Sequence, residues 1–267
     1  MLDVINAGKT FLKGTADEKA ALDHMNLHLD DGEFVTVLGS NGAGKSTLFN
    51  AVCGGFPLDN GQIVLDGQDI TFLPEHKRAR KIGRVFQDPL KGTAPHMTIA
   101  ENLAIAYSRS HRRALASAVS REDRELFRAA LARYHMGLED RMHTKVGQLS
   151  GGQRQAVTLL MCTLSVPKLL LLDEHTAALD PATAEKVMDI TRTVVAENRI
   201  TTMMITHNMG AALKTGTRTI LLDSGRILLD LSGEKRDRLT LDDLRALYTE
   251  KKKQELDNDR MLLEERG

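Results

Sequence analysis

The feature that most constrains this chain is a glycine-rich segment, residues 39–47, which reads Gly-Ser-Asn-Gly-Ala-Gly-Lys-Ser-Thr and follows the apolar run 34–38. It has the G-x-x-x-x-G-K-S pattern of a phosphate-binding loop between a strand and a helix. The glycines let backbone N–H groups turn toward a triphosphate, and the helix directs its positive dipole end at the same anion. A chance glycine-rich turn is the alternative, which these flanks disfavour. The predicted nucleotide-binding residues are Gly39, Ser40, Asn41, Gly42, Ala43, Gly44, Lys45, Ser46 and Thr47. Lys45 is expected to reach the outer phosphates, and the Ser46 hydroxyl to bind Mg²⁺.

The composition is that of a globular protein, with 42% hydrophobic and 27% charged residues in 267. Lys plus Arg and Asp plus Glu both number 36, so no net charge favours nucleic acid or anionic lipid. Residues 1–6 lack a basic segment followed by an apolar one, and no apolar run approaches the length of a membrane span. We therefore expect a soluble, cytoplasmic chain. Cys53 and Cys162 give no disulfide framework and are expected to be buried, reduced thiols.

Strand-like and helix-like segments alternate along the chain, which predicts an α/β fold with a mostly parallel sheet covered by helices. From residue 88 to about 148, apolar residues recur at helical spacing, so this block is expected to be a helical insertion. The expected strands are 4–6, 25–29, 34–38, 63–65, 83–87, 169–173, 201–206, 219–222 and 226–231. The expected helices include 45–53 and 182–197, and a charged helical tail is expected from residue 242.

Two carboxylates end the most apolar segment of the chain, where four leucines at 169–172 precede Asp173 and Glu174. A parallel strand covered on both faces is continuously apolar, and ligands gather at the carboxyl ends of such strands. We expect Asp173 to hold Mg²⁺ and Glu174 to polarise a water for attack on a γ-phosphate. The alternative is a solvated acidic strand end.

A second potential anion site lies at residues 149–153, which read Leu-Ser-Gly-Gly-Gln and precede a helix-like apolar stripe. Ser150 is a natural N-cap, and the glycines leave backbone N–H groups bare at the positive end of the helix. A simple capped helix start is the alternative interpretation.

Basic residues are densest in the core at Arg78, Arg80, Lys81 and Arg84. We expect a solvated loop there rather than a surface for nucleic acid, because no aromatic residues are interleaved to stack on bases. Nucleic acid is therefore not expected as a partner.

Several short motifs make the chain resemble the nucleotide-binding subunit of ABC transporters over nearly its whole length. Residues 149–153 stand as LSGGQ, which is peculiar to that family among phosphate-loop proteins. Gln87 matches the Q-loop glutamine, Asp180 after Ala178 and Leu179 matches the D-loop, and His207 matches the switch histidine. One departure is His175, which stands where the family usually has proline after the catalytic acid.

The resemblance implies an ABC-type P-loop ATPase core with an antiparallel β arm and an inserted helical subdomain. The implied boundaries are 1–87 for the first part of the core with the arm, 88–154 for the helical subdomain, 155–241 for the rest of the core and 242–267 for the tail. ATP and Mg²⁺ are the implied cofactors.

The resemblance also implies that two copies pack head to tail around ATP. Ser150, Gly151, Gly152, Gln153 and Asp180 of one copy would then complete the site at Lys45 of the other. Gln87 would contact Mg²⁺ and water, and His207 would hold Glu174, water and γ-phosphate in register. Phe11 is the candidate for stacking on adenine, with a plain core phenylalanine as the alternative.

The implied function is an ATP-hydrolysing subunit, peripheral to the cytoplasmic face of the membrane, that powers an ABC transporter. Integral membrane permease subunits and an extracytoplasmic solute-binding protein are the implied further partners. A chain of one cassette resembles bacterial importers of small solutes such as amino acids. A soluble single-cassette ABC ATPase of an assembly or remodelling complex is the alternative. A regulator without turnover is disfavoured because Glu174 and His207 are both present.

Overall fold

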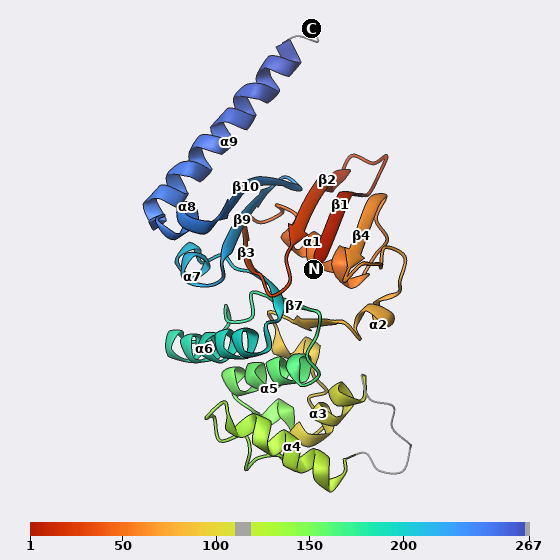
Figure 1. Cartoon of the computed structure of the whole chain (residues 1–267). Coiled ribbons are helices and arrows are strands. Elements are labelled where there is room, and N and C mark those ends of the chain that lie inside the picture. The colour runs from red at the N-terminus through yellow and green to blue at the C-terminus, as the bar shows by residue number, and fades with distance from the viewer. Residues whose placement is uncertain (110–118, 265–267) are drawn as a thin grey trace.

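The computed structural model describes residues 1–109 and 119–264, with side chains described as far as residue 253 in the last helix. Two sheets organise the molecule (Figure 1). The first is antiparallel, in the order β2-β1-β4-β5. Its strands are β1 (Leu2–Phe11), β2 (Lys19–Leu29), β4 (Asn60–Leu65) and β5 (Gln68–Asp69). This sheet is the antiparallel arm that the resemblance implies.

The second sheet has the order β10-β9-β3-β8-β7-β6, in which β9, β3, β8, β7 and β6 are parallel neighbours and β10 is antiparallel to β9. Its strands are β3 (Phe34–Gly39), β6 (Ile82–Val85), β7 (Leu169–Asp173), β8 (Thr201–Ile205), β9 (Arg218–Asp223) and β10 (Arg226–Ser232). The mostly parallel α/β architecture predicted from the sequence is confirmed.

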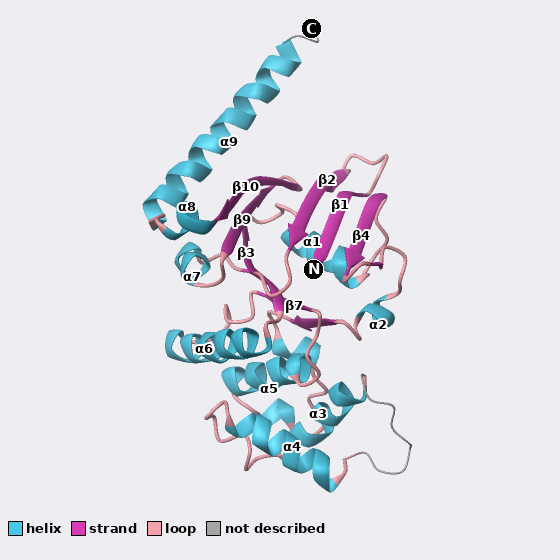
Figure 2. Ribbon diagram, viewed as in Figure 1, coloured by secondary structure: helices cyan, strands magenta, loops and turns pink. Residues whose placement is uncertain are grey.

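The helices lie on different sides of the second sheet (Figure 2). Helices α3 to α6 gather on the side of the second sheet away from the arm, while α1 lies between the two sheets. The bounds are α1 (Lys45–Cys53), α2 (Glu75–Arg78), α3 (Ile99–Ser108), α4 (Arg121–Ala132), α5 (Gly151–Thr163), α6 (Pro181–Asn198), α7 (Met209–Lys214), α8 (Gly233–Asp237) and α9 (Leu241–Glu264), with short 3₁₀ turns at Pro89–Gly92 and Val146–Gln148.

Strand β7 supplies both hydrophobic cores of the molecule, because successive side chains of a strand point to opposite faces. Leu169 and Leu171 belong to the core shared with α1 and the antiparallel arm. Leu170 and Leu172 belong to the core under helices α3 to α6. All four leucines are fully buried. A continuous apolar run is therefore what this position in the sheet requires.

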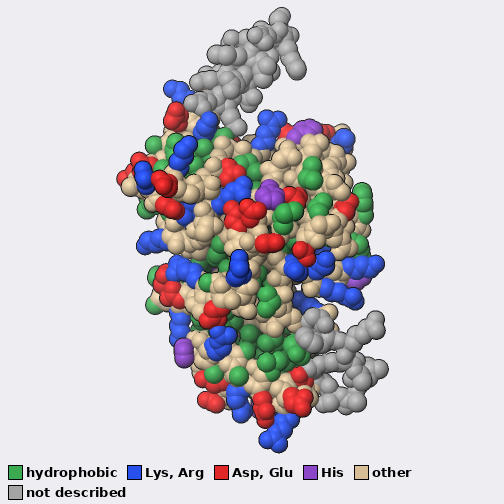
Figure 3. Space-filling view, viewed as in Figure 1, with side chains coloured by type: hydrophobic (Ala, Val, Ile, Leu, Met, Phe, Trp, Pro, Cys, Tyr) green, Lys and Arg blue, Asp and Glu red, His purple; other side chains and the backbone are tan. Residues whose placement is uncertain are grey.

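The C-terminal helix α9 packs through its first turns and then projects away from the sheets (Figure 1). Leu244 is fully buried in a small core with Leu38, Ala212, Leu221 and Leu229. Over the part of the chain that the structure describes, no helix is long and apolar enough to cross a lipid bilayer. On the face shown in Figure 3, acidic and basic side chains are interspersed, as the equal numbers of the two signs suggest.

Both cysteines are free: Cys53 is buried and Cys162 partly buried. Burial raises the pKa of each thiol to about 11, so both are protonated at neutral pH.

The expectation that the basic cluster is a solvated loop is wrong for two of its residues. Arg84 lies in β6 with only 16% of its side chain exposed, and Arg78 is 4% exposed. The Arg78 guanidinium donates to the carbonyl oxygens of Leu73, Ala51, Val52 and Thr71. Two of these carbonyls belong to the last turn of α1, where a cation also complements the helix dipole. Arg78 therefore stabilises the end of the helix that begins at the phosphate loop.

We predict that Arg78→Met lowers the free energy of unfolding by about 2–4 kcal/mol, because buried carbonyls lose charged donors. Chemical denaturation monitored by circular dichroism measures the loss. Lys77→Met, at the exposed neighbouring position, is the matched control and should leave stability within about 0.5 kcal/mol of the parent. Equal denaturation midpoints for Arg78→Met and Lys77→Met would contradict this stabilising role for Arg78.

Candidate nucleotide-binding site

The loop between β3 and α1 needs glycine because other backbone segments run against it. A Cβ on Gly39 would lie 2.5 Å from the carbonyl oxygen of Leu222, and one on Gly44 would lie 2.6 Å from that of Ala21. Gly39, Gly42 and Gly44 also have φ values of 152°, 82° and 102°, a region that side chains disfavour. Gly44 is the N-cap residue of α1. The loop is therefore held between β9 and β2 with its backbone N–H groups at the start of the helix.

Lys45 is buried inside this loop, with 6% of the residue exposed. Its Nζ donates to the carbonyl oxygens of Gly39 at 2.7 Å and Ser40 at 2.9 Å. Burial lowers the pKa of Lys45, while the charges of Glu174 and Asp173 raise it. The loop backbone therefore holds the ammonium group in place, close enough to both carboxylates to feel their charge.

A cavity of about 330 Å³ opens over the loop, and most of the predicted catalytic and binding groups meet there. It is lined by Phe11, Lys19, Ala21, Asn41, Gly42, Gly44, Lys45, Ser46, Thr47, Glu174 and His207. The predicted nucleotide-binding residues outside this lining are Gly39, Ser40, Ala43, Ser150, Gly151, Gly152, Gln153 and Asp180. One chain therefore brings together the phosphate loop, the candidate base and the switch histidine, but not the LSGGQ segment.

Glu174 follows β7 in a strained backbone conformation, with a φ of 47°. Its backbone N–H donates to the carbonyl oxygen of Ile205 at the end of the neighbouring strand. Its Oε1 lies 2.7 Å from Nε2 of His207, and the two side chains are 16% and 47% exposed. The adjacent strands β7 and β8 therefore deliver a carboxylate–imidazole pair to the cavity wall.

Asp173 and Gln87, which we expected at a metal, do not line this cavity. Asp173 Oδ2 accepts from the guanidinium of Arg84 on β6, at 2.9 Å. Gln87 is exposed just after β6. Gln155 of α5 donates to the carbonyl oxygen of Phe86, which ties the chain before Gln87 to the helical layer. The Arg84 contact was not predicted, because the sequence pattern does not show that the two residues face each other across paired strands.

The LSGGQ segment and the D-loop form the adjoining starts of α5 and α6. Ser150 Oγ accepts from the backbone N–H of Gln153, and Gln153 Oε1 accepts from that of Ser150, which makes a capping box. Asp180 caps α6 by accepting from the backbone N–H of Thr183, and hydrogen bonds from Thr183 lower the pKa of Asp180. A Cβ on Gly152 would lie 2.1 Å from Cγ2 of Thr183. The second glycine therefore lets the two helix starts approach each other.

Phe11, at the end of β1, lies at the rim of the cavity with 38% of the residue exposed. Its ring meets Phe56 edge to face at 5.3 Å, and Lys9 Nζ lies 5.7 Å from its centroid. Lys19, which sequence reasoning missed, stands over the phosphate loop: a Cβ on Gly42 would lie 2.8 Å from its Nζ. No signal in the sequence marked this position, because the strand was expected at 25–29, whereas β2 begins at Lys19.

His175, which stands where the resembled family usually has proline, is a packing residue here. It is 2% exposed, and its Nε2 lies 3.2 Å from the hydroxyl of Thr191 on α6. The Thr191 hydroxyl donates its proton to the carbonyl oxygen of Val187. Its oxygen is therefore free to accept a hydrogen bond from the neutral imidazole of His175. Burial lowers the pKa of His175 to about 4. The side chain therefore fixes the turn after Glu174 against α6.

Residues 22–177 match the ABC transporter family. The chain belongs to that family. It is 41% identical to a tyrosine transport ATP-binding protein of Clostridioides difficile (strain R20291), over 91% of this chain and 97% of that protein. As an ABC ATP-binding subunit, it binds and hydrolyses ATP.

Two further comparisons give the wider relationship. The chain is 34% identical to the spermidine/putrescine import ATP-binding protein PotA of Pasteurella multocida (strain Pm70), over 80% of this chain and 54% of that protein. It thus spans about half the length of that relative. The fold matches a dimeric ATP-binding cassette solved in a post-hydrolysis state with ADP and Pi, with a TM-score of 0.74, 30% identity, and coverage of 87% of this chain and 98% of that one.

We predict that Gly152→Ala lowers the free energy of unfolding by about 1–3 kcal/mol, because the added methyl group overlaps Thr183. Thr183→Ser removes the Cγ2 atom that the added methyl group would overlap. The double variant should therefore recover most of the lost free energy of unfolding. Thermal unfolding of the parent, both single variants and the double variant measures the coupling. A Gly152→Ala variant as stable as the parent would exclude the steric explanation.

Proposed function

We propose that this chain powers the uptake of an aromatic or related amino acid by an ABC transporter. The observation that carries the proposal is the 41% identity to a tyrosine transport ATP-binding protein, over 97% of that protein. The spermidine and thiamine importers among its relatives are less similar, at 34% identity. The cavity over the phosphate loop binds ATP, and solute selection belongs to a permease.

In the proposed hydrolysis, Glu174 accepts a proton from water as that water attacks the γ-phosphate in line with the leaving ADP. The 2.7 Å contact between Glu174 and His207 supports a paired role, in which His207 orients the carboxylate and the attacking water. Lys45 and the backbone N–H groups of its loop stabilise the charge on the phosphates. Phe11 stacks on the adenine ring from the rim of the cavity.

The residues near the loop offer the ligands that Mg²⁺ prefers, namely hard oxygens that leave room for water. Ser46, which lines the cavity, would supply a hydroxyl. Asp173 and Gln87, which do not line it, would supply a carboxylate and an amide oxygen. Within residues 1–109 and 119–253, no three His, Cys, Asp or Glu side chains gather into a metal cage. This donor set fits an ion that would be held jointly by the protein and the triphosphate, and Mg²⁺ bound there would supply positive charge to offset that of the phosphates.

The LSGGQ segment of a second copy completes each site in the proposed assembly. The support is that Ser150 through Gln153 lie outside the cavity of their own chain, while forming a capped helix start suited to an anion. Asp180 caps the adjoining helix α6 and would approach the same interface. Two copies would therefore close around two ATP molecules, in the proposed head-to-tail arrangement.

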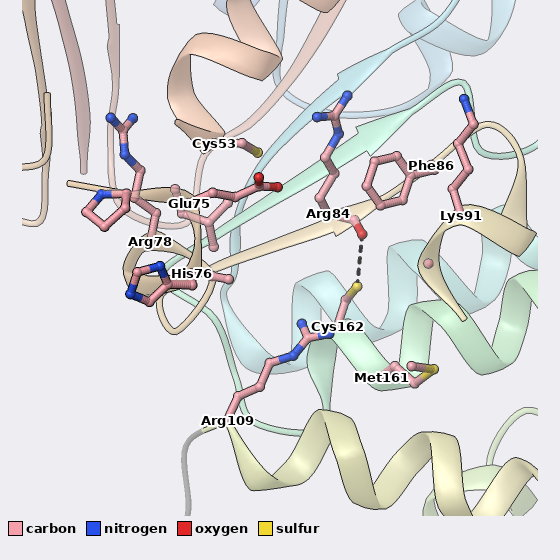
Figure 4. Close-up of a pocket in the computed structure, with 14 residues that line it drawn as sticks. Cys53, Glu75, His76, Arg78, Arg84, Phe86, Lys91, Arg109, Met161 and Cys162 are labelled. Carbon is pink, nitrogen blue, oxygen red and sulfur yellow. Dashed lines mark hydrogen bonds between the residues drawn. The ribbon is translucent and has the colours of Figure 1, made fainter. Parts of the chain in front are cut away.

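The proposed complex sits at the cytoplasmic face of the membrane with a permease, and an extracytoplasmic solute-binding protein delivers the solute. The permease would contact the cassette beside Gln87, where a cavity of about 730 Å³ opens between β6 and α5 (Figure 4). Among the Lys, Arg, Asp and Glu residues that line this cavity, four are basic and one is acidic, namely Arg78, Arg84, Lys91, Arg109 and Glu75. The excess of basic residues favours an acidic segment of the permease.

Affinity isolation of the tagged chain from gently solubilised native membranes tests this function. The proposal predicts a multi-span membrane protein in stoichiometric amount. The permease should then be reconstituted with the chain and ATP in vesicles, where labelled tyrosine should be taken up and spermidine should not. Recovery without any membrane partner would favour a soluble ABC ATPase of an assembly complex instead.

We predict that Glu174→Gln lowers the rate of ATP hydrolysis at least about 100-fold, the usual contribution of a general base. ATP binding should remain, because the amide keeps the shape of the carboxylate and Lys45 is untouched. Phosphate release and nucleotide binding are measured side by side. Glu185→Gln, at an exposed position on α6, is the control and should hydrolyse ATP at the parent rate. Parent turnover in Glu174→Gln would remove Glu174 as the base.

A further inference from the structure

The ion pair between Arg84 and Asp173 is built into the sheet beside the nucleotide cavity. Strands β6 and β7 are parallel neighbours, with Arg84 opposite Leu171 in the register. The guanidinium Nη2 lies 2.9 Å from Asp173 Oδ2, and each side chain is only 16% exposed. A charge pair this sheltered from water is screened less than a surface pair. The position of the Asp173 carboxylate is therefore tied to that of Arg84.

Arg84 has further contacts that hold it in place. Its Nη1 donates to Asn50 Oδ1 at 2.6 Å, and Asn50 belongs to α1, the helix that starts at Lys45. Its guanidinium carbon lies 4.7 Å from the centroid of the Phe86 ring, within the range of a cation–π interaction. Arg84 therefore links the strand before Gln87 to both the phosphate-loop helix and the acidic end of β7.

The same side chain also faces the cavity beside Gln87. Arg84 of β6 and Phe86, just after that strand, both line the cavity, and Figure 4 shows their side chains next to each other. The Sγ of Cys162 on α5 donates to the carbonyl oxygen of Arg84, which fixes the strand against the helical layer. A group that enters this cavity would thus contact the residues that hold Asp173.

We propose that Arg84 is a positioning residue that restrains Asp173 and so sets how readily the nucleotide site takes up Mg²⁺. The inference rests on the proposed function, in which Asp173 contributes to the metal site. A carboxylate paired with a guanidinium has part of its charge already neutralised, so a second cation gains less from it. A group that enters the cavity and draws Arg84 away from Asp173 would raise the affinity of the site for Mg²⁺. Lys45 would not be affected.

The first test is Mg²⁺ uptake by the ATP-bound full chain, measured by titration of MgCl₂ at fixed ATP. Arg84→Gln should lower the Mg²⁺ concentration for half-saturation by about 3- to 10-fold, because Asp173 loses its competing cation. ATP affinity in EDTA should remain that of the parent. Arg84→Lys keeps the positive charge, so its Mg²⁺ half-saturation concentration should lie closer to that of the parent than to that of Arg84→Gln. Arg109→Gln, which removes another charge from the cavity lining, should leave the Mg²⁺ half-saturation value at that of the parent.

An unchanged Mg²⁺ half-saturation in folded Arg84→Gln, with ATP still bound, would overturn the positioning role alone. Failure of the parent to bind ATP in EDTA or in Mg²⁺ would instead contradict the proposed nucleotide site. The two failures are therefore distinguishable.

A second measurement covers the case in which Arg84→Gln does not fold. The chain contains no tryptophan, so Phe86→Trp places a single indole against the Arg84 guanidinium. Addition of Mg²⁺ to the ATP-bound Phe86→Trp variant should shift its fluorescence emission, because Asp173 turns from Arg84 toward the metal. Emission that stays constant while Mg²⁺ binds would overturn the proposal.

Discussion

The position of β7 in the middle of the molecule is the constraint on which the rest depends. Its alternating leucines enter both hydrophobic cores, so a shift of register by one residue would exchange the two faces. The same register delivers Asp173 and Glu174 to the carboxyl edge of the sheet, where Ile205 of β8 anchors the backbone of Glu174. Packing and chemistry are therefore set by one short strand.

Residues in local motifs were predictable from the sequence, while the burial of Arg78 and Arg84 was not. The pattern around Lys45 and the strand before Glu174 led to the parallel α/β fold and to groups that meet in one cavity. Arg78 and Arg84 were misjudged because their partners come from other segments, the end of α1 and the neighbouring strand. A charged residue can be buried only where such partners converge, and that depends on tertiary structure rather than on the local pattern.

One chain holds two helix starts that we propose to bind the phosphates of ATP, and only the start of α1 opens into the nucleotide cavity. The start of α1 opens into the cavity with Lys45, while the start of α5 at Ser150 lies outside it and packs against α6. In the proposed head-to-tail assembly, a site divided in this way makes tight closure around ATP depend on a second copy. Hydrolysis would then release the closed state, which lets ATP chemistry drive movement of an attached membrane partner.

The measurement that tests this division most directly is mixed-dimer formation between two defective copies, each in a Glu174→Gln background. One copy carries Lys45→Ala and the other Ser150→Arg, and differently sized tags distinguish them in analytical ultracentrifugation with ATP. Head-to-tail closure predicts mixed dimers, because one intact composite site remains, and few dimers of either copy alone. Absence of mixed dimers, while Ser150→Arg alone dimerises like its parent, would contradict the account.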